Sequence, residues 1–123
     1  AEELASCCFL NNGKGGFTKV VLPAQLQLAP LFAFNTTFIN NKTCFIGAGN
    51  FYGVTPYEGR YDAQQPTIFS FNSAAQNFEV VSTMKVNVGE VRDIKWINSV
   101  NRKHFLILTQ NNDRLIFMEQ TIK

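Results

Sequence analysis

Charged residues, histidine and long apolar runs are all scarce in this sequence of 123 residues. Only 16% of the residues are charged, and 11 Lys and Arg against 9 Asp and Glu leave a formal net charge of +2. That charge is too small for the basic surface on which binding to a phosphate backbone depends. No apolar run approaches the ~20 residues that a helix needs to cross a bilayer. The composition therefore argues against nucleic acid as a partner and against membrane insertion.

Cysteine and histidine are also few, and their spacing limits what they can do. The chain has three cysteines, Cys7, Cys8 and Cys44, and a single histidine, His104. Neighbouring residues of a strand point to opposite faces, so Cys7 and Cys8 cannot both bridge to Cys44. No CxxC spacing accompanies His104, which leaves no zinc-type ligand set. We therefore expect no metal and no cofactor, and we interpret the cysteines as chemically idle thiols.

The residues that are abundant indicate an all-β fold. The chain has 12 Phe and one Trp, with many Asn and Thr and few long helix-forming residues, a composition typical of β-sheet proteins. Short β-type runs recur between turns that are rich in Asn and Gly. These runs predict nine strands, over residues 5–11, 17–22, 31–39, 43–48, 66–72, 78–83, 90–99, 104–110 and 114–119.

Two of these runs have informative patterns. Residues 105–109 are apolar on both faces, so we expect a central strand there. Residues 91–96 alternate, with one face predicted to carry Arg92, Ile94 and Trp96 and the other Val91, Asp93 and Lys95. An adjacent arginine and aspartate in such a strand are typical of structural hydrogen bonds at a sheet edge or at a seam between sheets.

The segment 49–65 is too long for a simple hairpin turn. It carries three tyrosines, Tyr52, Tyr57 and Tyr61, together with glycines and a proline. Loops of this length in compact domains are often packed or functional. The tyrosines could hold an ordered loop together, or they could line a site for a small ligand or a sugar, because tyrosine offers an apolar ring with a polar tip.

A set of motifs in a fixed order resembles one known family. Asn12-Gly13-Lys14-Gly15-Gly16-Phe17 is similar to the turn and strand opening of FG-GAP repeats, also called VCBS repeats, which build integrin-α-like β-propellers. The likeness covers nearly the whole chain, and its motifs occur in the same order in the terminal propeller segment of large FG-GAP proteins from Bacteroidetes. Its further motifs are Gly49-Asn50-Phe51-Tyr52-Gly53-Val54, Pro56, Glu58-Gly59-Arg60-Tyr61-Asp62-Ala63, Gly89-Glu90-Val91-Arg92-Asp93-Ile94 and Asn111-Asn112-Asp113.

The resemblance implies antiparallel, four-stranded, blade-like sheets in an exported protein, either periplasmic, associated with the outer membrane or extracellular. The strands would form a partial blade over 5–22, a full blade over 31–83 and a partial blade over 90–119, about two to two and a half blades. Closed propellers need about four to eight blades. We therefore expect part of a longer propeller chain or a homo-oligomer, with an open β-sandwich or barrel as the alternative.

One position departs from the family pattern. FG-GAP repeats often carry a calcium loop between the first two strands of a blade, where carboxylates bind the cation. Here that position reads Asn40-Asn41-Lys42 and holds no carboxylate. We therefore expect no calcium there, and a turn held by asparagine side chains.

The function implied is a non-catalytic binding or scaffold module, with a protein or glycan as a possible ligand. The loop after residue 49 is the expected contact surface. The candidate binding residues are Tyr52, Tyr57, Glu58, Arg60, Tyr61 and Asp62.

A structural network is expected to hold this loop. We expect Arg60 and Asp62 to pair with Asp93 and Arg92 of the next blade. The residues assigned to the network are Arg92, Asp93, Asn111, Asn112 and Asp113.

Two alternatives remain open. A carbohydrate-binding, lectin-like module would use the tyrosine loop. A carboxylate-based hydrolase would need two acids facing one cleft, and its candidates are Glu58, Asp62, Glu90 and Asp93. We do not expect an enzyme, because the sequence assigns no nucleophile to the single histidine.

Overall fold

The computed structural model describes residues 4–52 and 64–120, and these residues form three antiparallel sheets. The first is a hairpin of β1 (Cys7–Asn11) and β2 (Phe17–Val21), followed by a 3-10 turn, η1 (Ala24–Leu26). The second sheet has the order β3-β4-β5-β6 and the third β7-β8-β9. The strands of these two sheets are β3 (Leu31–Ile39), β4 (Lys42–Gly49), β5 (Thr67–Asn72), β6 (Asn77–Thr83), β7 (Val91–Asn98), β8 (His104–Gln110) and β9 (Ile116–Gln120).

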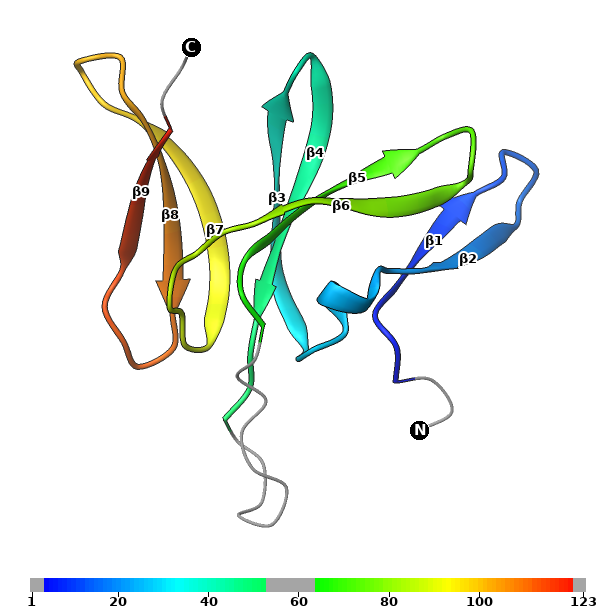
Figure 1. Ribbon diagram of the computed structural model, residues 1–123, viewed down its shortest axis with the longest axis horizontal. Coiled ribbons are helices and arrows are strands. Elements are labelled where there is room, and N and C mark those ends of the chain that lie inside the picture. The colour runs from blue at the N-terminus through cyan, green and yellow to red at the C-terminus, as the bar shows by residue number, and fades with distance from the viewer. Residues whose placement is uncertain (1–3, 53–63, 121–123) are drawn as a thin grey trace.

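The all-β prediction and the grouping of strands as two, four and three are confirmed. Each sheet is a simple meander in which consecutive strands pair, and none of the three closes into a barrel. Figure 1 shows the four-stranded sheet between the β1–β2 hairpin and the three-stranded sheet. The three-stranded sheet packs on it through β7 and β3, and the hairpin packs on it through β2 and β6. Within the described residues, no helix has the length and apolar character that crossing a bilayer requires.

The larger core lies between the four-stranded and the three-stranded sheets. Ile46 and Ala48 of β4 pack there against Ile94 of β7 and Leu106 and Leu108 of β8, and all five are at most 1% exposed. The predicted central strand is confirmed, since β8 pairs with a strand on either side. Its outward residues are half-buried while its inward leucines are fully buried.

A smaller, aromatic core covers the other face of the four-stranded sheet. Leu22 and Leu26, from the segment that follows the hairpin, pack against Phe69 of β5. The rings of Phe69 and Phe45 lie 5.5 Å apart and each meets Phe78 of β6 at a steep angle. Such tilted aromatic pairs add stability beyond the area that they bury. This core fixes the hairpin to the sheet.

The predicted face assignment of β7 is wrong at one residue. Val91 was expected beside Asp93 and Lys95, yet it is fully buried in the same core as Ile94. The reason is a β-bulge, because Val91 pairs with Gln110 and Asp93 with the adjacent Thr109, which leaves Arg92 without a partner in the ladder. An extra residue in one strand reverses the alternation on one side of the bulge.

Asparagine controls the turns, as the sequence indicates. Asn40 and Asn41 form the β3–β4 turn with φ values of 50° and 60°, the positive φ pair of a type I′ hairpin turn. In the β1–β2 turn the Asn12 side chain accepts hydrogen bonds from the backbone of Lys14 and Gly16 at 2.8 and 3.0 Å. Asparagine side-chain hydrogen bonds therefore hold the β1–β2 turn, whereas the β3–β4 turn uses the positive φ values that asparagine tolerates, and the side-chain hydrogen bonds expected there stay a prediction.

The three thiols are free. Cys44 is 2% exposed in the larger core, whereas Cys7 and Cys8 are half-buried on the hairpin. A buried cysteine of this kind packs as a small apolar residue.

Candidate functional site

Asn50 joins four segments at the end of the molecule from which the long loop leaves. It is fully buried and adopts a φ of 84°, a conformation that asparagine tolerates better than most residues. Its side-chain amide donates to the carbonyls of Gln64 and Gly89 at 3.0 and 3.1 Å and accepts from the Gln64 backbone at 2.9 Å. Its own backbone N–H donates to Pro30 at 3.0 Å. Through its backbone and its side chain, this one residue thus connects the segments that precede β3, β5 and β7.

Gly49, directly before Asn50, permits the close approach of Pro30. A Cβ placed on Gly49 would lie 1.8 Å from the carbonyl oxygen of Pro30 and 2.8 Å from the Cα of Leu31. Both atoms belong to the backbone and cannot turn aside. The Gly-Asn pair that forms part of the motif therefore has a structural reason in both residues.

An ion pair at the start of β7 also contacts Asn50. The Arg92 guanidinium bonds to the Glu90 carboxylate at 2.8 Å and donates to the carbonyl of Asn50 at 3.0 Å. It also lies over the ring of Phe32, 4.1 Å from the ring centre. Glu90 accepts in addition from the backbone N–H of Tyr52 at 3.1 Å. Charge-assisted bonds of this kind are about twice as strong as neutral ones, so they hold the start of the long loop to the third sheet.

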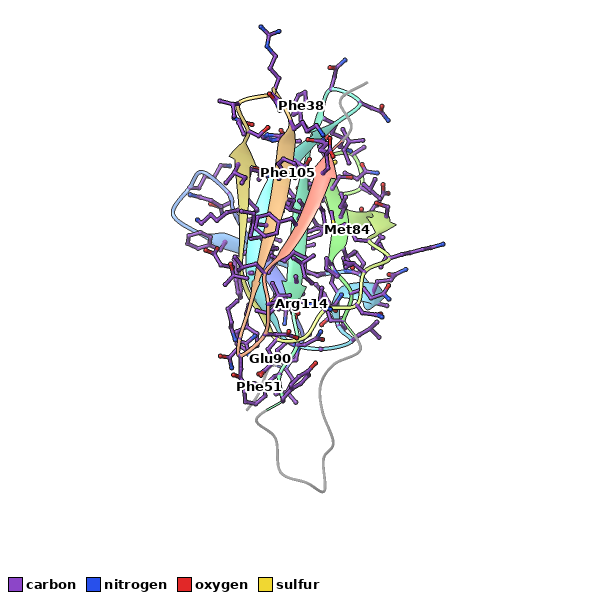
Figure 2. The ribbon with its side chains drawn as sticks, turned by 90° about the vertical axis from the view of Figure 1, so that its left-hand side faces the viewer. Phe38, Phe51, Met84, Glu90, Phe105 and Arg114 are labelled. Carbon is purple, nitrogen blue, oxygen red and sulfur yellow. The ribbon has the colours of Figure 1, made fainter. Side chains whose placement is uncertain are left out.

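Polar groups also converge on Gly89. Its N–H donates to the Gln110 side-chain oxygen, and the Gln110 amide donates to Arg114 at 2.8 Å. A Cβ on Gly89 would come within 3.4 Å of the Tyr52 hydroxyl and 3.7 Å of an Asp113 carboxylate oxygen. We call the whole cluster the Asn50 junction. It comprises Asn50, Tyr52, Gly89, Glu90, Arg92, Gln110, Asn111 and Asp113, and Figure 2 shows its Glu90 beside Phe51 at the lower end of the molecule.

The first hairpin of the second sheet and the first hairpin of the third share one irregularity. In β3 the residue Phe32 is skipped by the ladder, just as Arg92 is in β7. The two hairpins also share a backbone hydrogen bond just past their paired residues. In the first hairpin the N–H of Asn50 donates to the carbonyl of Pro30 at 3.0 Å, and in the second the N–H of Asn111 donates to the carbonyl of Glu90 at 2.8 Å. The two hairpins therefore follow one plan, and their two bulged residues stack on each other.

The predicted site residues are distributed as follows. Tyr52, Arg92, Asn111 and Asp113 come together in the junction, and Asn112 occupies the adjoining turn with a φ of 53°. Asp93 lies outside the junction, where it accepts from the Ile94 backbone and approaches Lys95 at 3.9 Å.

The other loop predictions cannot be placed. Tyr57, Glu58, Arg60, Tyr61 and Asp62 lie outside the described residues, so the expected pairs of Arg60 and Asp62 with β7 stay predictions.

The central members, Asn50 and Gln110, were not predicted as functional. Asn50 could have been suspected from the sequence, because a Gly-Asn pair at the end of a strand suits a positive φ. No local pattern indicates that Gln110 reaches Gly89.

The contacts of the junction are structural and connect the second sheet to the third. Its one carboxylate–guanidinium pair is neutralised internally, the amides of Asn50 and Gln110 are bonded to backbone groups, and the Asn111 amide donates to Glu90. Among residues 4–52 and 64–120, no three His, Cys, Asp or Glu side chains gather closely enough to hold a metal ion.

Comparison with known proteins adds no relative. No protein-family model matches this sequence, and no curated protein matches it. The likeness to FG-GAP repeats therefore rests on the motifs and stays a prediction.

Proposed function

We propose that the chain is a non-catalytic scaffold and binding segment of a larger stack of β-sheets, of the FG-GAP type and belonging to an exported protein. The observation that carries the proposal is the outer face of the three-stranded sheet, which has a row of large apolar residues at its centre and no sheet packed on it among the described residues. The repeated hairpin plan supports it, because repeat proteins stack units of one design side by side.

The outer face of the third sheet combines large apolar residues on β8 and β9 with the charged residues Asp93 and Lys95 on β7. Ile97 pairs with Phe105, and Lys95 with Ile107, which in turn pairs with Phe117. Ile97 and Phe117 are 41% and 57% exposed. Figure 2 looks onto this face, on which Phe105 is labelled. The ion pair between Lys103 and Glu119, at 3.6 Å, lies at its margin. An apolar centre with a charged margin is the pattern of a surface that meets a partner.

The opposite end of the molecule presents a second surface of this kind. Phe9 and Val21 are 60% and 52% exposed on the hairpin face that turns away from Cys8 and the aromatic core. A stack open at both ends fits a position inside a longer series of sheets. The Asn50 junction would then set the spacing between neighbouring sheets, as a scaffold requires.

The test is the molar mass in solution, measured by light scattering over a range of protein concentrations. We expect association that increases with concentration and that is reduced by Phe117→Lys, which places a charge on the outer face. Val100→Lys is the matched control, because Val100 is fully exposed in the β7–β8 turn, off that face. A monomer at every concentration, or equal effects of the two variants, would contradict the proposal.

A further inference from the structure

The third sheet ends in an edge strand that differs from the other edges. In the second and third sheets the edge strands are β3, β6, β7 and β9. The first three each carry a bulge, at Phe32, Val81 and Arg92, where the ladder skips one residue. In contrast, β9 pairs with β8 in unbroken register from Ile116 to Gln120. Bulges protect an edge from pairing with another strand, so among these four edges only β9 lacks that protection.

The sequence of β9 also favours pairing with a further strand. A strand inside a sheet has its backbone N–H and C=O groups bonded on both sides, and within residues 4–52 and 64–120 β9 has a partner strand on one side only. Proteins also protect their edges with proline or with charged side chains. The sequence of β9, Ile-Phe-Met-Glu-Gln, has no proline and a single charge. That charge, on Glu119, is already compensated by Lys103 at 3.6 Å.

The core between the second and third sheets is incompletely covered beside this edge. Because β7 packs on β3 and β4, the three strands of the third sheet end before the four strands of the second. The inward residues Ile116 and Met118 of β9 are only half-buried, whereas Leu106 and Leu108 of β8 are fully buried. Among the described residues, the inner face of the second sheet therefore extends past the last strand that covers it.

A hollow of about 210 Å³ lies between the two sheets at this place. Its lining is mainly apolar and includes Ile68, Met84, Leu106 and Met118. In Figure 2 Met84 lies to the right of β9, the side on which β9 has no partner strand. An apolar cavity of about 150 Å³ can hold a benzene ring, so this hollow has room for one large apolar side chain.

We propose that the free edge of β9 binds an extended segment of a partner protein, which adds a fourth strand to the third sheet and inserts one large apolar side chain into this hollow. Recognition of this kind combines backbone hydrogen bonds with pockets for alternate side chains. The segment should carry apolar residues at alternate positions, with basic residues on its other face opposite Glu119. The proposal concerns the edge of the sheet and not its outer face, so it does not depend on the scaffold role proposed above.

The probe for the test is a synthetic peptide, Lys-Val-Thr-Phe-Thr-Val-Lys, acetylated at its N-terminus and amidated at its C-terminus. Its sequence reads the same in both directions, so it presents the same side chains whether it adds parallel or antiparallel to β9. Trp96 lines the hollow and is the only tryptophan in the sequence, so its fluorescence monitors the insertion of the phenylalanine. We expect a saturable fluorescence change with a dissociation constant of about 1 mM or lower.

Two further readouts separate pairing at the edge from binding to another surface. The same peptide with alanine in place of phenylalanine should bind about tenfold or more weakly, because it leaves the hollow unfilled. Amide hydrogen exchange should become slower in residues 116–120 when the peptide is bound, because their free N–H groups acquire partners. Exchange in residues 91–98 of β7, at the bulged opposite edge of the same sheet, should not change.

Variants of the protein locate the hollow as the site of insertion. Met84→Lys places a charge in its apolar lining and should weaken binding of the phenylalanine peptide about tenfold or more. Met84→Leu keeps the lining apolar and should leave the dissociation constant within about twofold of the original value. Val100→Lys is the control for the added charge, because Val100 is fully exposed in the β7–β8 turn and does not line the hollow.

Three results would overturn the proposal. The first is the absence of a saturable fluorescence change with the phenylalanine peptide. The second is binding without slower exchange in residues 116–120, since the peptide would then lie elsewhere. The third is exchange in these residues that slows as the protein concentration rises without peptide, because a second copy of the chain would then occupy the edge. If circular dichroism shows that Met84→Lys does not fold, the exchange measurement on the unaltered protein still decides.

Discussion

Replacing Asn50 with alanine should destabilise the protein far more than the loss of an ordinary surface asparagine. The variant loses three side-chain hydrogen bonds, two donated to Gln64 and Gly89 and one accepted from Gln64. At a net value of about 1 kcal/mol each, these bonds contribute roughly 3 kcal/mol. Alanine at a φ of 84° adds about 1 kcal/mol of strain. The expected loss of about 4 kcal/mol is large beside the 5–15 kcal/mol that typically stabilises a domain.

Two further variants separate the contributions. Asn50→Gly removes the same bonds but tolerates the positive φ, so it should recover about 1 kcal/mol relative to alanine. Asn72→Ala is the matched control, because Asn72 also makes three side-chain hydrogen bonds, but in the exposed β5–β6 turn, where water can replace them. Its expected cost is about 1 kcal/mol or less.

The assay is urea unfolding, followed by the fluorescence of Trp96 and by circular dichroism. The free energy of unfolding is taken from the midpoint with a common slope. If Asn50→Ala and Asn72→Ala lose the same free energy, the burial of the Asn50 bonds does not matter and the reasoning fails. If Asn50→Ala does not fold, the comparison is made with Asn50→Gly.

Two other substitutions test the packing by the same unfolding assay. Gly49→Ala should lower the free energy of unfolding by at least about 3 kcal/mol, because its Cβ would overlap the backbone of Pro30. Gly16→Ala is its control and should lower that free energy by less than about 1 kcal/mol, because its Cβ would meet only the flexible side chain of Asn12. Equal losses would show that the backbone at residue 30 can yield. Leu108→Ala should lower the free energy of unfolding by about 2–5 kcal/mol, since Leu108 is fully buried. Leu115→Ala, at a half-exposed position, is its control and should change that free energy by no more than about 1 kcal/mol. A small effect at residue 108 would mean that the sheets move together and fill the cavity.

Strand positions could be predicted from the sequence because asparagine and glycine mark nearly every turn. The predicted runs over residues 31–39 and 104–110 coincide with β3 and β8, and the others differ from the observed strands by at most two residues at either end. The prediction rests on two local signals, the alternation of apolar residues along a strand and the φ preferences of turn residues.

What could not be predicted depends on partners distant in the chain. The bulge at Arg92 reverses the alternation that the face assignment relies on, and nothing in residues 90–94 alone indicates it. The role of Asn50 requires Pro30, Gln64 and Gly89 to arrive at one point. The stack of Trp96 on His104 follows from the pairing of Asn98 with His104, which the length of the β7–β8 turn sets.

The paired bulges have a consequence for how sheets of this kind could recognise their neighbours. A bulged residue is free of the ladder, so its side chain can change without disturbing the strand pairing. Phe32 and Arg92 occupy these two positions and meet face to face across the seam. In a longer series, each seam would bring together one such pair of side chains. The choice of aromatic, basic or acidic residue at a single position per sheet would then suffice to define which sheet follows which.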